Sequence, residues 1–158
     1  MVKKMAYVLA CSAMMIAHGE QYTNVFQVLN APLTAEVLNL IDESDATSPD
    51  RLFLAFMKTC TQGRLNGFLS LFTDAYIASE FGVADKNAFT SADMLDFQQF
   101  FNDVSVTNKT LLSYSCTVSG NVANVTATMV MHTRSRAINE DFEMIFMRTN
   151  GVWKIMQW

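Results

Sequence analysis

The feature that most constrains this chain is a change of hydrophobic period near residue 105. Before it, apolar residues recur at the roughly 3.6-residue spacing of a helix, and after it they alternate at the two-residue spacing of a strand. Two dipeptides interrupt the alternating part, Gly120-Asn121 and Asn150-Gly151. Both are typical of two-residue hairpin loops, because glycine and asparagine tolerate positive φ. The pattern therefore predicts helices first and then an antiparallel meander of about four strands.

Three helical stretches are expected before the strands. Ser48-Pro49 begins the first, with the serine hydroxyl as the cap and proline in the first turn. The second covers FLSLFTDAYIA, and Ser91 is expected to cap the third, ADMLDFQQFFNDV. Upstream, Thr34 is a candidate cap for AEVLNLI. Helices followed by a meander predict an α+β fold with the helices on one face of a bent antiparallel sheet.

The two hairpins predict which strand residues face the helices. Pairing Ser119 with Val122 separates apolar from polar side chains, and a slip by one residue would mix them. The inner face of the first hairpin then holds Leu112, Tyr114, Cys116 and Val118 opposite Ala123, Val125, Ala127 and Met129. In the closing hairpin, the corresponding face holds Phe142, Met144, Phe146, Arg148, Trp153, Ile155 and Gln157.

The outer face of the closing hairpin is also largely apolar. It carries Ile145, Met147, Val152 and Met156. A solvated surface normally exposes less contiguous apolar area than this. We therefore expect the protein to be a homodimer that pairs through the outer face.

The first 19 residues have the order of an export signal. Lys3 and Lys4 precede the apolar run MAYVLACSAMMIA, and small residues follow at Ala17 and Gly19. The run is shorter than the roughly 20 residues that span a bilayer, so no stable membrane span is expected. We predict a signal peptide at 1–19 and a periplasmic or secreted bacterial protein. Residues 20–48 then form an N-terminal extension with an acidic linker, and residues 49–158 form the main domain.

Charge and residue supply exclude several classes of function. The net charge is −4, and removal of Lys3 and Lys4 with the signal makes it more negative. Phosphate backbones attract basic surfaces, so no nucleic-acid partner is expected. The sequence lacks P-loop and G-x-G-x-x-G motifs, and one certain histidine with two distant cysteines is a poor supply of ligands. We expect no cofactor and no metal.

The two cysteines that remain after processing are Cys60 and Cys116. In an oxidising compartment they could pair, or they could stay free as small core residues. Cys60 ends the first long helix, and Cys116 faces inward from the sheet expected to cover it. We therefore expect their Cα atoms within the roughly 7 Å that a disulfide allows.

This order of elements resembles the nuclear transport factor 2-like (NTF2-like) superfamily, which includes ketosteroid isomerases and SnoaL-type cyclases. The resemblance covers roughly residues 49–158 and rests on LSLFTD (69–74) and the closing GVWKI (151–155). It implies a cystatin/NTF2-like cone, in which about three N-terminal helices pack on a bent sheet, often around an apolar pocket. Many relatives have a short strand pair where AYIASEFGVADKNAF predicts helix and loop.

If such a pocket is present, the inner sheet face supplies its lining. The candidate ligand-binding residues are Tyr114, Met129, Met144, Phe146, Arg148 and Trp153. Arg148 beside Trp153 could hold an anionic head group while the apolar walls hold the rest of the ligand. The alternative is a filled core, with Tyr114 bonded to the backbone and Arg148 extending to solvent.

No catalytic residue is identified. The alternation of side chains along its strand places His132 on the outer face of the sheet. Asp96 and Asp103 are explained as acidic residues on the surface of a helix. We therefore expect an exported, non-catalytic domain that binds a small apolar or anionic-amphipathic ligand or a protein partner. The alternative, which rests on the resemblance, is a cofactor-free isomerase, cyclase or hydrolase of the SnoaL or ketosteroid isomerase kind.

Overall fold

The computed structural model describes residues 21–103, 108–132 and 136–158, except the side chains of residues 100–103 and 108. The predicted signal peptide, residues 1–19, lies outside this range. The described 3₁₀ turns are Val25–Gln27 (η1) and Lys86–Ala88 (η2). The α-helices are Ala35–Asn39 (α2), Pro49–Gln62 (α3), Leu65–Ser70 (α4), Asp74–Phe81 (α5) and Ser91–Asp103 (α6). The strands are Asn108–Ser119 (β1), Val122–His132 (β2), Ala137–Thr149 (β3) and Val152–Gln157 (β4).

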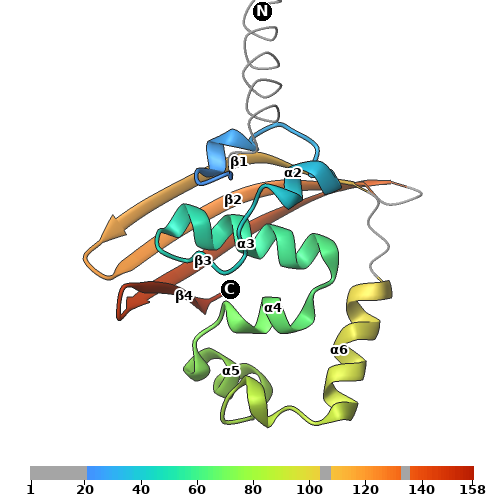
Figure 1. The fold of residues 1–158 in the computed structure, drawn as a ribbon, viewed down its shortest axis with the longest axis vertical. Coiled ribbons are helices and arrows are strands. Elements are labelled where there is room, and N and C mark those ends of the chain that lie inside the picture. Colours follow the sequence, from blue (N-terminus) through green and yellow to red (C-terminus); the bar gives the residue numbers. More distant parts are fainter. Residues whose placement is uncertain (1–20, 104–107, 133–135) are drawn as a thin grey trace, which may run out of the picture.

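The strands form an antiparallel sheet in chain order, β1-β2-β3-β4 (Figure 1). The α+β class and the meander are therefore confirmed. Ser119 pairs with Val122, as predicted. Asn150 and Gly151 have φ of 53° and 79°, the two positive values that a type I′ turn requires.

The first hairpin differs from its predicted register in one place. The pairing shifts between Leu111 and Ser113, so Leu112 is the extra residue of a β-bulge and is 40% exposed. Leu111 is buried in its place. Because a bulge reverses the facing of the residues on one side of it, the prediction is correct for Tyr114 and wrong for Leu112. Val118, also predicted to face inward, is 53% exposed near the hairpin loop. The closing hairpin has a second shift, which pairs Gln157 with Ile145, so the prediction that Gln157 shares the inner face with Ile155 is wrong.

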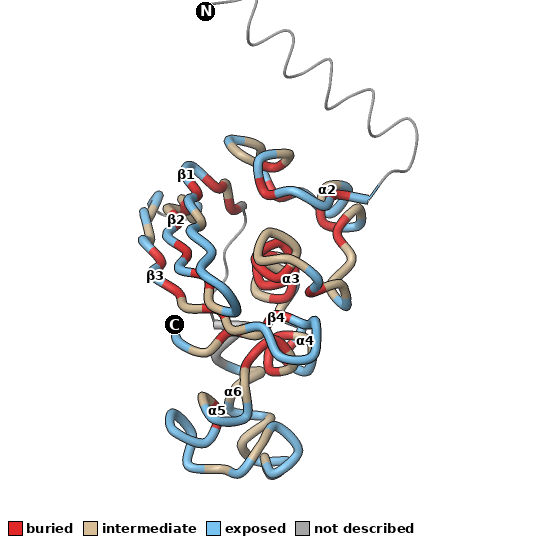
Figure 2. The backbone as a smooth tube through the Cα atoms, turned by 90° about the vertical axis from the view of Figure 1, so that its left-hand side faces the viewer, coloured by how far each residue is buried: buried red, intermediate tan, exposed pale blue. Residues whose placement is uncertain are grey.

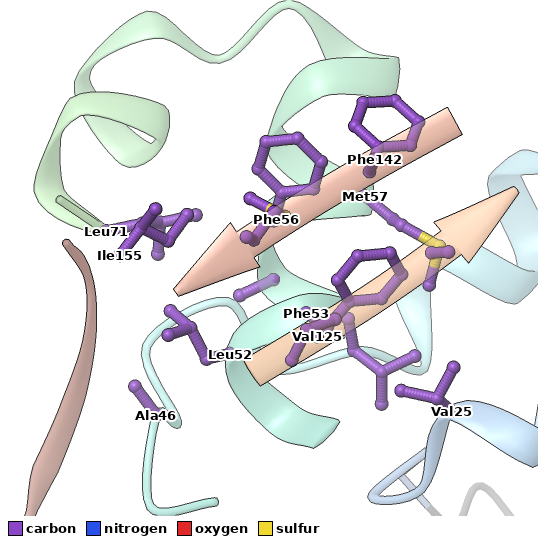
Figure 3. Packing of buried hydrophobic residues seen from close by; sticks show 14 of the residues in the cluster. Val25, Ala46, Leu52, Phe53, Phe56, Met57, Leu71, Val125, Phe142 and Ile155 are labelled. Atoms are coloured by element: carbon purple, nitrogen blue, oxygen red, sulfur yellow. The ribbon is translucent and has the colours of Figure 1, made fainter. Parts of the chain in front are cut away.

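Helix α3 fills the inner face of the sheet. Its start is as predicted, since the Ser48 hydroxyl accepts a hydrogen bond from the Arg51 N–H at 3.2 Å. Figure 2 shows α3 as largely buried and the strands beside it with buried and exposed stretches in alternation. Phe53 and Phe56 project from α3 among sheet residues such as Val125, as Figure 3 shows. These side chains form the centre of the hydrophobic core.

The N-terminal segment belongs to the same core. Residues 20–48 were expected to be an extension and linker, yet their described part buries Tyr22, Val25, Val28, Leu33, Leu38, Ile41 and Ala46. The segment also runs along β1, where the Asn30 and Leu33 N–H groups donate to the carbonyls of Leu111 and Lys109 at 2.7 and 2.8 Å. These bonds cover backbone groups that an edge strand would leave open.

The opposite edge of the sheet, β4, is covered in a similar way. The Trp153 N–H donates to the Ala46 carbonyl at 2.9 Å, which ties the acidic segment to the sheet. Ile155 donates to the Leu71 carbonyl at 2.8 Å and accepts from the Thr73 N–H at 2.9 Å. Phe72 thus forms a parallel bridge with Ile155, and the predicted second helical stretch is split into α4 and α5.

Helix α6 begins with a reciprocal cap. The Asp93 N–H donates to the Thr90 hydroxyl at 3.2 Å, and the Thr90 N–H donates to the Asp93 carboxylate at 2.8 Å. Thr90 is therefore the cap, one residue before the predicted Ser91. Leu95, predicted on the apolar face of this helix, is 59% exposed. None of the described helices has the length and the apolar character that a membrane crossing needs.

Candidate binding site

The six residues predicted to bind a ligand have three different environments. Four are buried in the hydrophobic core: Met129, Met144, Phe146 and Trp153. Tyr114 is also buried in that core, but its hydroxyl is only partly buried, and Arg148 is exposed. The strands bring the set to one face of the sheet, as expected. Ligand binding by these residues stays a prediction, and it would require the core beneath the sheet to open.

Tyr114 is bonded to a side chain of α3. Its hydroxyl donates to Asp50 Oδ1 at 3.0 Å, and Asp50 Oδ2 accepts from the Val25 N–H at 3.4 Å. Burial, and then the nearby Asp50 carboxylate, raise the pKa of Tyr114. The hydroxyl therefore stays protonated and its one proton is engaged by a carboxylate, where a backbone partner had been considered.

Arg148 lies beside Trp153, as predicted. The two residues pair across β3 and β4, and the guanidinium carbon is 5.5 Å from the centroid of the indole ring. Arg148 Nε and Nη2 donate to Asn121 Oδ1 at 3.2 and 3.1 Å. The guanidinium thus holds the loop of the first hairpin against the end of β3.

The predicted proximity of the cysteines is wrong. Both thiols are free. Cys116 is close enough to Asp50, in the first turn of α3, for that carboxylate to contribute to the raised pKa of the thiol. Cys60 lies in the last turn of the same helix. At the rise of an α-helix, Asp50 and Cys60 are about 15 Å apart along its axis.

A buried lysine lies at the Cys60 end of α3. Lys109 is only 8% exposed, and burial lowers the pKa of its ammonium group. Burial raises the pKa of the Cys60 thiol to about 12, so at neutral pH this thiol is a poor nucleophile. Sequence reasoning missed Lys109, because its position before the bulge had not been assigned to the inner face.

An open hollow lies between α5 and α6, away from the sheet core. We call it the α5–α6 hollow. It has a volume of about 490 Å³ and is lined by Phe81, Val83, Phe89, Asp93, Asp96 and Phe97. Gly82 ends α5 with φ of 69°, a left-handed turn that sends the chain through η2 to the Thr90 cap of α6. None of the six predicted ligand-binding residues lines it.

Three phenylalanine rings form the apolar wall of the hollow. Phe81 contacts Phe97 and Phe89 with ring centroids at 5.1 and 5.5 Å, and Phe89 contacts Phe97 at 5.3 Å. The angles between the ring planes are 68°, 80° and 89°. Edge-to-face contacts of this kind are favourable for aromatic pairs. The wall remains partly open, since Phe81 is 38% exposed.

The acidic side of the hollow is supplied by α6. Asp93 accepts hydrogen bonds from the Thr90 hydroxyl and N–H, and these bonds lower the pKa of its carboxyl. Asp96 lies nearly one turn later and is exposed. The sequence feature that could have indicated this site is the set of phenylalanines in and around ADKNAFTSAD. This segment is also where the chain departs from the NTF2-like pattern. Only the contacts among Phe81 at the end of α5, Phe89 in the connecting segment and Phe97 of α6 bring the rings together.

Comparison of the chain with protein-family models and with curated proteins found no match. Within the described residues, no group of three or more histidine, cysteine, aspartate or glutamate side chains is placed to hold a metal ion. The candidate site is thus an aromatic hollow with two carboxylates in its lining.

Proposed function

We propose that this chain is an exported, non-catalytic NTF2-like domain that binds a small apolar ligand in the α5–α6 hollow. The observation that carries the proposal is the partly open wall of three phenylalanines. Small-molecule sites are concave and mostly apolar, with a few polar groups, and their volumes begin near 300 Å³. The hollow, at about 490 Å³, lies within that range.

The hollow is a better ligand site than the space beneath the sheet. Met129, Met144 and Phe146 are at most 3% exposed and pack in one cluster with α3. A ligand there would have to displace close-packed side chains. At the hollow, the wall is already open to solvent. The two aspartates disfavour an anionic ligand at this place.

Membership of the NTF2-like superfamily is supported by the order of elements. A capped helix, α3, lies across the inner face of a four-stranded antiparallel meander, and the remaining helices precede the strands in the chain. An experimental structure of the protein purified from its host would test the cone shape and any ligand that it retains.

Binding at the hollow is tested with a neutral apolar fluorescent probe, N-phenyl-1-naphthylamine. We expect its emission to rise with the protein and the rise to fall by more than half in Phe89→Ala. Phe26→Ala is the matched control, since Phe26 is an exposed phenylalanine of η1. Equal loss in both variants, or no rise with the wild type, would contradict the proposal.

The enzyme alternative is supported by one observation, the Tyr114–Asp50 pair. A tyrosine hydroxyl and a carboxylate are the groups that a cofactor-free isomerase uses as donor and base. Here the tyrosine proton is engaged by that carboxylate at 3.0 Å, and the neighbouring core is filled. We therefore favour binding over isomerase, cyclase or hydrolase activity.

We further propose a homodimer through the outer face of the closing hairpin. Ile145 and Met147 are half-buried there and Val152 is 40% exposed. Met156 is also half-buried, but it is the extra residue of the bulge between Ile155 and Gln157. Light scattering at micromolar concentration should give twice the chain mass. A Met147→Lys variant should then become monomeric, because a buried unpaired charge opposes association. A monomeric wild type would rule the dimer out.

The proposal of export is supported by the residue order at 1–19. Intact mass of the protein from its natural host should lack about the first 19 residues, as cleavage of a short signal requires. Full-length protein recovered from the cytosol would contradict export and a periplasmic or secreted location.

A further inference from the structure

The α5–α6 hollow combines rings and charge in a way that selects among ligands. Resting on the function proposed above, we infer that the ligand is a small organic cation, with an alkylated ammonium group held by the phenylalanine wall and the two aspartates. A neutral apolar ligand would use only the wall. The inference thus adds the sign of the ligand's charge.

The first argument is the orientation of the rings. An aromatic face carries negative charge density and attracts cations, while the ring edge is positive. Phe81, Phe89 and Phe97 lie at 68° to 89° to one another. Three nearly perpendicular planes share no common edge-on direction. An occupant that approaches the three rings from one direction therefore cannot meet all of them edge-on.

The second argument is the charge at the margin. Asp93 and Asp96 line the hollow, and none of the described residues that line it is basic. The hydrogen bonds from Thr90 keep the Asp93 carboxyl ionised at neutral pH, because they lower its pKa. The whole chain is also acidic, with 15 acidic and 11 basic residues, so its field attracts cations.

The third argument is the small number of hydrogen-bond acceptors in the lining of the hollow. The described lining consists of four apolar side chains and two carboxylates. A primary ammonium group has three donors, and the rings offer no acceptor atoms. The acceptors among the described lining residues are the two carboxylates, and Asp93 already accepts two bonds from Thr90. An alkylated ammonium group has fewer donors or none, is weakly hydrated, and suits aromatic surroundings. This favours a quaternary or highly alkylated amine over a lysine-like one.

The test compares three ligands of one shape: choline, the neutral 3,3-dimethylbutan-1-ol and the anionic 3,3-dimethylbutanoate. Binding to the full-length protein is followed by NMR through the backbone amides of α5 and α6. We expect choline to bind about three- to thirtyfold more tightly than the neutral alcohol, the span of cation–π attraction. The anion should bind more weakly than the alcohol.

Three variants test which side chains cause the preference for choline over the neutral alcohol. Asp96→Asn should weaken choline severalfold without changing the alcohol, since Asp96 is an exposed side chain whose loss leaves the apolar wall intact. Phe97→Leu keeps apolar volume and removes a π face, so it should reduce the ratio between cation and alcohol. Glu80→Gln makes the same charge change on α5 outside the hollow and should alter neither affinity.

The outcomes separate the two proposals. Equal affinity for choline and the alcohol at the hollow would overturn the inference about charge and leave apolar binding standing. No shift of α5 and α6 amides with any of the three ligands would overturn both. A choline preference that persists in Asp96→Asn and Phe97→Leu would place the cation elsewhere and also overturn the inference.

Discussion

The core under the sheet and the α5–α6 hollow are both rich in aromatic residues, yet side chains fill the first and leave the second open. In the core, the long apolar stripe of α3 meets long alternating strands, and Phe53, Phe56 and Phe146 are at most 1% exposed. In the hollow, α5 is an eight-residue helix and its last residue, Phe81, is 38% exposed. A wide, matched interface closes, whereas a short helix that meets α6 at its last residue leaves an open wall for a ligand.

The largest expected difference is in the cost of removing a phenylalanine. Phe146→Ala in the core should lower the free energy of unfolding by about 3–5 kcal/mol, because it removes buried surface and leaves a cavity. Phe97→Ala in the hollow should cost about 1–2 kcal/mol, mostly from partial burial and lost ring contacts. Urea unfolding monitored by circular dichroism measures both. Equal costs would mean that the hollow is closed in solution.

The next comparison concerns two tyrosine hydroxyls. Tyr114→Phe should cost about 1.5–3 kcal/mol, since it removes the bond to the Asp50 carboxylate at the margin of the core. Tyr76→Phe is the control, because its hydroxyl makes a longer 3.4 Å bond to the Trp158 carbonyl in an exposed place. It should cost at most about 0.5 kcal/mol. Equal values in urea titrations would show that the Tyr114–Asp50 bond is not formed.

A third prediction tests the helix that carries the acidic side of the hollow. Thr90→Ala should destabilise the protein by about 1 kcal/mol, the typical value of a helix cap. Ser91→Ala is the control, since Ser91 was the predicted cap and Thr90 is the observed one. The helical signal of α6 by NMR chemical shifts should weaken in Thr90→Ala and not in Ser91→Ala. The reverse result would mean that Ser91, and not Thr90, caps α6.

Arg148→Ala tests the exposed end of the sheet. Its bonds to Asn121 and its contact with the Trp153 ring are accessible to solvent, so we expect a loss of about 0.5–1 kcal/mol, the value of an exposed cation–π contact. Thermal unfolding with Arg148→Lys as the conservative variant measures it. A loss comparable to that of Phe146→Ala would mean that Arg148 belongs to the core.

The smallest effect is a pH dependence confined to the start of α6. The pKa of Asp93 is lower in the folded protein than its ordinary value of 3.8. Its stabilising contribution is therefore complete above that value and is lost as the pH falls through the lowered pKa. NMR shifts of the first turn of α6 should move in this acidic range, and Thr90→Ala should reduce the movement. A shift that begins near neutral pH would contradict this assignment.

Local features of the fold could be predicted because they depend on neighbouring residues. Ser48-Pro49 begins a helix in any context that permits one, and Asn150-Gly151 supplies both positive φ angles of its turn. In the same way, the alternation of side chains over residues 113–117 predicted which face of the sheet each of them occupies. The predicted facing of Leu112 was wrong because of one inserted residue. A bulge cannot be recognised from the alternation of one strand until the pairing with its partner strand is known.

The candidate site depended on contacts that the sequence does not contain. Tyr114 contacts Asp50 across 64 positions of the chain, and Phe72 pairs with Ile155 because β4 leaves its edge open there. Phe81 was expected in a segment of helix and loop and Phe97 on the third helix, and it is the contact between their rings that makes them one wall. By itself, the sequence determined the elements and their order through turns, caps and periods. Which surfaces are filled and which stay open was decided by tertiary packing, because it depends on how completely two distant surfaces match.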